Sequence, residues 1–215
     1  MAEEIITKED LDQAIAILNT NYPGTWAIIG GCCSNIHGSN RPTADIDIIV
    51  ERRVTINHPS LPLVDGKLHV KLPSGKLLKL DVILEVNDKH SYEDLSSHIS
   101  NTALGAQIVD DVASLGLKLN TYYRRPDNRE GKRESDLDDI VFYTNKLLKE
   151  GRTLTLNDTL PFQINCYNFY LIRKELRFLG EWENFLQVGG QNFEKNREEH
   201  TQDELDIMEC VSESD

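Results

Sequence analysis

The chain lacks long hydrophobic runs. Its longest apolar stretches, AIAIL and DIDIIV, are far shorter than the roughly 20 residues that a membrane-spanning helix needs. The first residues, MAEEIITKEDL, are acidic and have no basic segment followed by an apolar core, which is the pattern of a secretory signal. These features argue against a transmembrane or secreted protein, and we expect a cytoplasmic location with no membrane partner.

Cysteine is scarce, and its spacing fits no known framework. The four cysteines, Cys32, Cys33, Cys166 and Cys210, form no CxxC motif and are not accompanied by a paired histidine pattern. The sequence therefore supports neither a zinc site nor a set of disulfides, which fits a reducing compartment. Packing under a neighbouring loop is sufficient to explain Cys32 and Cys33.

Positive charge is also in short supply. The chain has 23 lysines and arginines against 36 aspartates and glutamates, a net charge of −13. A generic nucleic-acid surface needs an excess of positive charge, so the composition argues against one. More than half of the net negative charge lies in residues 191–215, a polar segment that we interpret as a solvated tail, frayed or disordered.

The rest of the composition is that of a globular protein. The chain has 215 residues, of which 39% are hydrophobic and 27% charged, enough for a genuine core. Strand patterns crowd the N-terminal part and helical patterns fill the remainder. We therefore predict the α+β class, with a small mixed β-sheet, flanking helices and a helical C-terminal part. The expected parts are an α/β core over residues 1–100, a helical region over 101–190 and the acidic tail over 191–215.

Individual elements can be located from caps, breakers and periodicity. Thr7 and Asp10 resemble a capping box, and the apolar residues that follow share one helical face. The turn signal Pro73-Ser-Gly75 separates two strand-like segments, which predicts a hairpin over residues 64–86. The other expected strands cover residues 26–29 and 44–51, and the other expected helices cover 34–37, 92–99, 111–124, 135–150, 161–179 and 181–188.

Two aspartates, Asp45 and Asp47, lie one residue apart inside the apolar segment DIDIIV. Alternate residues of a strand share one face, so the like charges of both carboxylates oppose each other unless a positive charge lies between them. Asp81 lies on a later expected strand, and neighbouring strands can converge at one edge of a sheet. Carboxylate oxygens suit magnesium, and two metals about 4 Å apart can clamp an in-line displacement at phosphorus. We therefore predict a Mg²⁺ or Mn²⁺ site at these three aspartates.

A glycine pair precedes the aspartates. Glycine lets the backbone approach a polyphosphate closely, and a helix that begins behind Gly30 and Gly31 offers unpaired N–H groups to phosphate oxygens. The hydroxyl of Ser34 can add one hydrogen bond. The segment is therefore a candidate nucleotide site.

Together these motifs resemble the signature of the DNA polymerase beta-type nucleotidyltransferase superfamily: GG, thirteen residues, DID, and a later strand LKLDVIL. The longer string GGCCSNIHGSNRPTADIDI resembles the branch that contains bacterial abortive-infection toxins. That branch also has a helical lysine, matched by Lys118 in LGLKLNTYYRR, and a later Asp-x-x-Asp, matched by Asp136 and Asp139 in SDLDDI. The residues that match the branch's first motif are Gly30, Gly31, His37, Gly38, Arg41, Thr43, Asp45 and Asp47.

The resemblance implies a nucleotidyltransferase core whose active site is completed by the helical region. Asp45, Asp47 and Asp81 would hold the metal, and Asp81 would also act as the general base. Lys118 would neutralise the triphosphate, and Asp136 would orient Lys118 or a base. An ordinary reading stays open for each: Lys118 as a surface lysine and Asp136 as a helix cap. Arg41 and Thr43 would contact the nucleotide, although Thr43 can also simply cap the turn, and a packing role is favoured for His37.

The implied reaction transfers a nucleoside monophosphate from an NTP to an acceptor hydroxyl and releases pyrophosphate. The resemblance favours an RNA 3′ end, with tRNA as one case. Some members of the branch are inhibited by an antitoxin, and whether this chain has an inhibitory protein partner stays open. Two alternatives stay open: nucleotidylation of a protein or an aminoglycoside-like molecule, and a catalytically silent nucleotide-binding module. The basic residues that could contact RNA phosphates, or simply pair with surrounding acids, are Arg124, Arg125, Arg129, Lys132 and Arg133.

Overall fold

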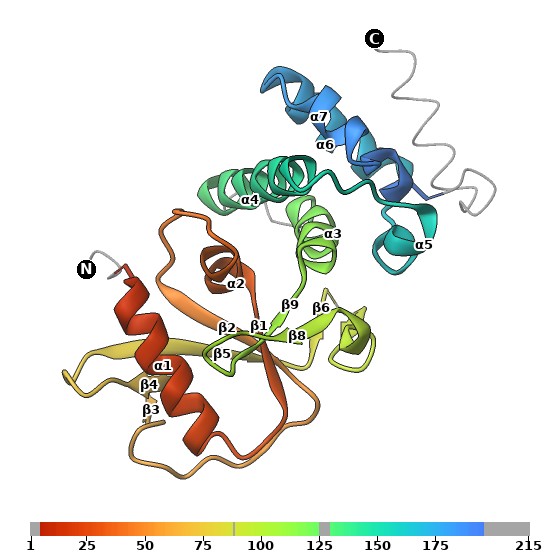
Figure 1. The fold of residues 1–215 in the computed structure, drawn as a ribbon. Coiled ribbons are helices and arrows are strands. Elements are labelled where there is room, and N and C mark those ends of the chain that lie inside the picture. The colour runs from red at the N-terminus through yellow and green to blue at the C-terminus, as the bar shows by residue number, and fades with distance from the viewer. Residues whose placement is uncertain (1–4, 88, 125–129, 196–215) are drawn as a thin grey trace. The chain divides into compact units, whose positions relative to one another are not determined.

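A computed structural model describes residues 5–87, 89–124 and 130–195. Its packing divides the chain into two units, Met1–Asp110 and Asp111–Asp215 (Figure 1). The first unit holds a seven-stranded mixed sheet and the second is helical in its described part. The predicted α+β class is therefore confirmed. Among the helices of the described residues, none is long and apolar enough to cross a membrane.

The sheet has the strand order β3-β4-β5-β2-β1-β9-β8. Its central strands are β1, paired antiparallel with β2, and β2, paired parallel with β5. The continuous apolar run of β1 fits this place, because all four of its residues are buried. The strands are β1 (Trp26–Ile29), β2 (Asp45–Val50), β3 (Leu63–Val64), β4 (Lys67–Lys71), β5 (Leu77–Ile83), β8 (Ile99–Asn101) and β9 (Gln107–Val109), and a separate pair is formed by β6 (Glu85–Val86) and β7 (His90–Ser91).

Helix α1 (Lys8–Asn21) packs against β4 and begins with the expected capping box. The Thr7 hydroxyl accepts a hydrogen bond from the Asp10 amide at 3.1 Å, and the Asp10 carboxylate accepts one from the Thr7 amide at 3.0 Å. Two otherwise unpaired N–H groups of the first turn are satisfied in this way. The predicted apolar face is buried: Leu11, Ala14, Ile15 and Leu18.

The predicted hairpin is confirmed with narrower bounds, residues 67–83 in place of 64–86, because β6 pairs with β7 in a separate sheet. Strands β4 and β5 pair antiparallel, and Leu72 and Lys76 close the turn through a 2.9 Å hydrogen bond from the Leu72 amide to the Lys76 carbonyl. Gly75 has a φ of +88°, a left-handed conformation that a side chain would strain. The turn chemistry of Pro-Ser-Gly therefore fixes where β5 starts.

The helix expected over residues 92–99 is wrong. Its capping signal is real, since the Ser91 amide donates to the Asp94 carboxylate at 2.9 Å and the Asp94 amide donates to the Ser91 hydroxyl at 3.2 Å. Only a short 3₁₀ helix, η1 (Ser96–His98), follows, because the chain then leaves as strand β8, in which Ile99 pairs with Val109. A long-range strand pairing has overridden a local helix signal.

The second unit contains helices joined by short connections. The bounds are α3 (Asp111–Tyr122), α4 (Glu130–Lys149), α5 (Leu156–Thr159), η3 (Leu160–Phe162), α6 (Cys166–Phe178), α7 (Trp182–Gln187) and η4 (Gly190–Phe193). The helix expected over residues 161–179 is interrupted, because Ile164 forms a β-bridge with Glu194 and Asn165 caps the new helix α6.

Helices α3 and α4 pack together, and α3 also contacts η3 at very short range. A Cβ added to Gly116 would lie 2.4 Å from the Cβ of Phe162, so only glycine fits there. The Asn120 amide donates to the carbonyls of Gly116 and Phe162 at 3.0 and 2.8 Å. The end of the expected acidic tail, residues 196–215, lies outside the described residues.

The capping carboxylate of Asp10 makes a testable electrostatic contribution. The hydrogen bond from Lys76 at 2.8 Å, followed by the bond to the Thr7 amide, holds the pKa of Asp10 below its usual range. A carboxyl with a lowered pKa in the folded state stabilises the fold above its unfolded pKa of about 3.9, and this contribution disappears as the pH falls through the folded value.

Asp10→Asn should therefore lower the free energy of unfolding by about 1 kcal/mol at pH 7 and by less at pH 3. Urea titration at both pH values measures the difference. Asp12→Asn is the matched control, because the Lys8–Asp12 pair is exposed and should contribute little. Equal losses for both variants, or a pH-independent loss for Asp10→Asn, would contradict this assignment.

Candidate metal and nucleotide site

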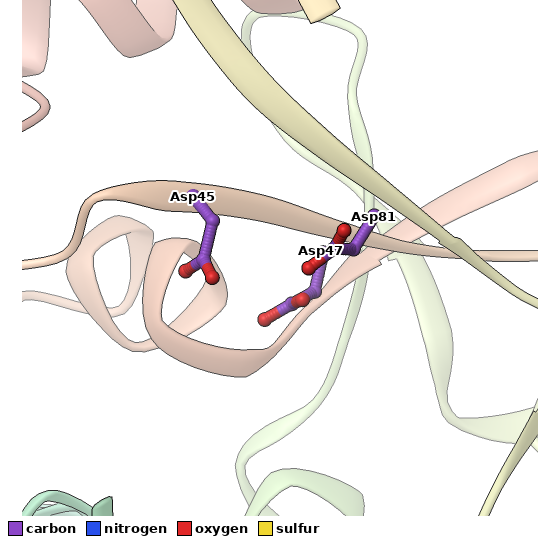
Figure 2. Close-up of side chains that lie close together, drawn as sticks. All are labelled: Asp45, Asp47 and Asp81. Atoms are coloured by element: carbon purple, nitrogen blue, oxygen red, sulfur yellow. The ribbon is translucent and has the colours of Figure 1, made fainter. Parts of the chain in front are cut away.

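The three predicted aspartates are brought together by the pairing of two parallel strands. In the register of β2 and β5, Asp47 lies opposite Asp81 and Asp45 lies opposite Lys79. Parallel neighbours in register share one face, and residues two apart on one strand share it as well. All three carboxylates therefore point from the same face of the sheet, as Figure 2 shows.

The geometry of this cluster, Asp45, Asp47 and Asp81, suits a divalent cation. One oxygen from each carboxylate lies within 4.8 Å of the other two, and each residue is half-buried. Oxygen ligands of this kind are those of Mg²⁺ and Mn²⁺, which keep part of their coordination for water or phosphate. The donor set therefore fits such an ion in number, chemistry and accessibility.

Lys79 was not among the predicted site residues, yet it lies within the cluster. Its ammonium forms an ion pair with Asp81 and a second one, at 3.7 Å, with Asp45. Burial opposes the charged form, but the hydrogen bond to Asp81 and the nearby negative charges outweigh it and raise the pKa of Lys79. The alternation in LKLDVIL puts Lys79 on the face of Asp81, which is the signal that could have identified it.

Gly30 is required beside this cluster. Its φ of +67° is left-handed, and a Cβ there would lie 2.2 Å from an Asp47 carboxylate oxygen. Helix α2 (Gly30–Ile36) begins at this glycine, so the helix expected over residues 34–37 starts four residues earlier than predicted. Two glycines can occupy the first turn because tertiary contact, not propensity, decides this short helix.

Gly31 and its neighbours form the second side of the site. A Cβ at Gly31 would lie 2.7 Å from the Thr43 hydroxyl and 2.8 Å from a terminal nitrogen of Arg41. The absence of a side chain thus lets the guanidinium of Arg41 lie against the backbone of the glycine pair. Arg41 is half-buried, so part of its side chain stays accessible to an anion.

Two side chains, Thr43 and Cys32, hold the start of β2 by hydrogen bonds. The Thr43 hydroxyl and the Cys32 thiol each donate to the carbonyl oxygen of Asp45 at 3.3 Å. Burial, together with the charges of Asp47 and Asp45, raises the pKa of the Cys32 thiol, so it stays protonated and remains a donor. Thr43 is itself buried, and its role in this structure is to orient the strand that carries the aspartates.

Two other residues of the predicted motif have structural roles: Ser34 is buried, and His37 contacts the backbone of β9. Ser34 is fully buried and its hydroxyl donates to the Gly30 carbonyl at 3.3 Å, so it presents no accessible group to a nucleotide here. The Nε2 of His37 lies 2.8 Å from the Val109 carbonyl, where it serves as a donor that ties α2 to β9. The favoured packing role of His37 agrees with this contact.

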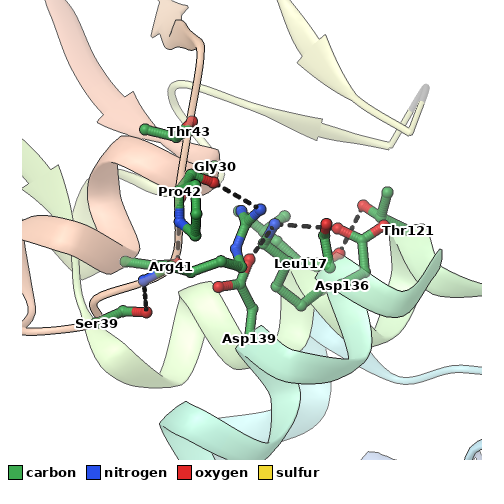
Figure 3. Close-up of polar contacts among 12 residues, drawn as sticks. Gly30, Ser39, Arg41, Pro42, Thr43, Leu117, Thr121, Asp136 and Asp139 are labelled. Carbon is green, nitrogen blue, oxygen red and sulfur yellow. Dashed lines mark hydrogen bonds and ion pairs between the residues drawn. The ribbon is translucent and has the colours of Figure 1, made fainter. Parts of the chain in front are cut away.

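In the second unit, Lys118 on α3 and Asp136 on α4 are brought together. The ammonium of Lys118 lies 3.0 Å from an Asp136 oxygen and 2.6 Å from an Asp139 oxygen. Figure 3 shows both aspartates projecting from α4. The two carboxylates are almost fully buried, so this cation neutralises a buried pair of charges. The sequence motif contained Asp139, but its direct contact with Lys118 needs the packing of α3 on α4.

The expected basic patch is described only in part, since Arg125 and Arg129 lie outside the described residues. Arg124 and Lys132 are exposed, whereas Arg133 is half-buried with its guanidinium 5.7 Å from the ring centre of Tyr122. Stacking of this kind holds the guanidinium in place.

No model of a known protein family matches the chain, and no curated protein matches it.

The contact between Gly30 and Asp47 can be separated from backbone strain. Gly66 has nearly the same φ, +73°, but open space around its Cβ position, so Gly66→Ala measures strain alone, about 1 kcal/mol. Gly30→Ala should cost at least about 1 kcal/mol more, because Asp47 must also move. Urea denaturation of both variants gives the comparison, and equal losses would show that Asp47 does not press on Gly30.

Lys118, Asp136 and Asp139 form a buried charged cluster. The free energy of unfolding should fall more when the lysine is removed than when one carboxylate is removed. Lys118→Met leaves two buried carboxylates without this cation and should destabilise the protein by about 3–5 kcal/mol. Asp139→Asn keeps the Asp136 contact and should cost about 1.5–3 kcal/mol. Asp138→Asn, at the exposed neighbouring position, is the control. A loss for Lys118→Met no larger than that of the control would contradict the arrangement.

Proposed function

We propose that the protein is a metal-dependent nucleotidyltransferase that transfers a nucleoside monophosphate from an NTP to an acceptor hydroxyl and releases pyrophosphate. The observation that carries the proposal is the placement of three carboxylates on one sheet face against a glycine pair that tolerates no side chain. Because Asp47 packs against Gly30 and Arg41 packs against Gly31, the glycine pair holds a carboxylate that suits a metal and a guanidinium that suits phosphate in one place.

The residues proposed to hold the cation are Asp45, Asp47 and Asp81. A bound Mg²⁺ or Mn²⁺ would supply positive charge at the phosphate oxygens during the displacement. Asp45 and Asp47 are held by a strand that is central in the sheet and is anchored at the Asp45 carbonyl by two donors. Rigid support of this kind keeps the carboxylates in place and reduces the cost of ordering them.

The nucleotide side is assigned to the glycine pair and Arg41. The missing Cβ of Gly31 lets the guanidinium of Arg41 lie against the glycine pair, where it can donate two parallel hydrogen bonds to phosphate oxygens. Ser34 and Thr43 support the loop and the strand from inside. The family resemblance assigns Lys118 to the triphosphate and Asp136 to the orientation of Lys118 or a base.

Asp81 is proposed as the general base. Its side chain is 38% exposed, compared with 24% for Asp45, so it can receive a proton from an incoming hydroxyl. The acceptor oxygen forms a bond to the α-phosphorus as the bond from that phosphorus to the bridging oxygen breaks. Pyrophosphate leaves with the bond's electron pair, and the hydroxyl proton passes to the Asp81 carboxylate.

An RNA 3′ end is the acceptor favoured by the resemblance, and the exposed Arg124 and Lys132 support it as anchors for RNA phosphates. The test incubates the protein with each of four α-labelled NTPs, Mg²⁺ or Mn²⁺, and total RNA. Label on RNA supports this acceptor, and label on protein supports the alternative of protein nucleotidylation. A parallel incubation with an aminoglycoside tests the small-molecule alternative, and absence of transfer to all three acceptors contradicts an enzyme.

The double variant Asp45→Asn/Asp47→Asn should lose at least about 1,000-fold of the transfer rate, because the cation and the phosphate charge it offsets are no longer held. Asp65→Asn is the matched control: it removes one exposed carboxylate of the same unit, and asparagine tolerates the positive φ of that turn. Chelation of divalent ions with EDTA should abolish transfer by the wild type. Transfer that survives either treatment would exclude the proposed mechanism.

A further inference from the structure

We propose that Lys79 is a positioning residue that occupies the cation position of the aspartate cluster in the metal-free protein, and that a divalent cation binds by displacing its ammonium. This inference rests on the proposed function, because it concerns how the same site is loaded. It predicts that one of the three negative charges of the site is offset when no metal is bound.

The cluster needs a positive charge in every state of the protein. Three carboxylates whose oxygens lie within 4.8 Å repel one another, and the sheet that carries them would be destabilised if they were left alone. Lys79 supplies that charge, since its ammonium contacts both Asp81 and Asp45. Without a metal, the Lys79 side chain therefore performs part of the task that a metal would perform.

The position of Lys79 follows from the sheet register and not from a flexible loop. It is the in-register partner of Asp45 on the neighbouring strand and lies two residues before Asp81 on the same face. Its backbone cannot leave the cluster while β2 and β5 are paired. Its ammonium can leave, because it is carried on a four-carbon stem and the side chain is 34% exposed.

The Lys79 ammonium and a divalent metal ion repel each other at this site. The Asp81 oxygen that binds Lys79 belongs to the same carboxylate that would ligate the metal, and an ammonium next to a divalent ion is repelled by it. We therefore expect metal binding to break the Lys79–Asp81 pair, so that the measured metal affinity includes that cost. Removing the ammonium should tighten the site, whereas removing an ordinary structural residue would loosen it.

The test measures Mn²⁺ binding to the purified full chain without nucleotide, by electron paramagnetic resonance of free Mn²⁺. Lys79→Met should bind Mn²⁺ about 10-fold more tightly than the wild type, and Lys79→Arg, which keeps the charge, should stay within about threefold of it. Lys76→Met removes a lysine paired with Asp10 at 2.8 Å elsewhere in the unit and should leave the affinity unchanged. The double variant Asp45→Asn/Asp47→Asn should abolish Mn²⁺ binding, which would show that the ion binds at the aspartate cluster.

A second readout guards against misfolding of the variant. Without metal, Lys79→Met should melt at a lower temperature than the wild type, and saturating Mn²⁺ should raise its melting temperature by more than it raises that of the wild type. If the wild type binds Mn²⁺ and Lys79→Met binds it with the same or a lower affinity, the role of Lys79 is overturned and the proposed function is left intact. Absence of Mn²⁺ binding in the wild type and in Lys79→Met would overturn both.

Discussion

The in-register parallel pairing of β2 with β5 is the constraint on which the site depends. It sets Asp47 beside Asp81 and Asp45 beside Lys79, so that three carboxylates and one ammonium share a single face. A shift of one residue in this register would send Asp81 and Lys79 to the opposite face and separate the charges. The buried residues Ile46, Ile48 and Leu80 alternate with the charged ones and hold the register, because the same shift would expose them.

The surrounding backbone is built around these charges. Gly30 leaves room for the Asp47 carboxylate, Gly31 leaves room for Thr43 and Arg41, and the Asp45 carbonyl is held by Thr43 and Cys32. Each contact links the glycine turn to the start of β2. The glycine pair and the aspartate pair therefore form one structural unit, which explains why both occur within one short stretch of sequence.

Local signals in the sequence were sufficient for much of the fold. The capping box of α1, the Pro-Ser-Gly turn and the common face of Asp45 and Asp47 depend on neighbouring residues and could be read directly. The failure at residues 92–99 has the opposite cause, since a valid capping signal at Ser91 and Asp94 was overridden by the pairing of β8 with β9. The alternation of LKLDVIL puts Lys79 on the face of Asp81, but its contact with Asp45 depends on the pairing of β5 with β2. The contact of Lys118 with Asp139 likewise depends on how two helices pack.

The central claim is that a divalent cation binds where Asp45, Asp47 and Asp81 converge. The most direct measurement is anomalous diffraction at the manganese edge from a crystal soaked with Mn²⁺ and a non-hydrolysable NTP. We expect an anomalous peak within about 2.0–2.4 Å of oxygens from these carboxylates, with phosphate oxygens among the remaining ligands and the Lys79 ammonium turned away. A crystal in which Mn²⁺ or the triphosphate binds elsewhere, with Lys79 still paired to Asp81, would contradict it.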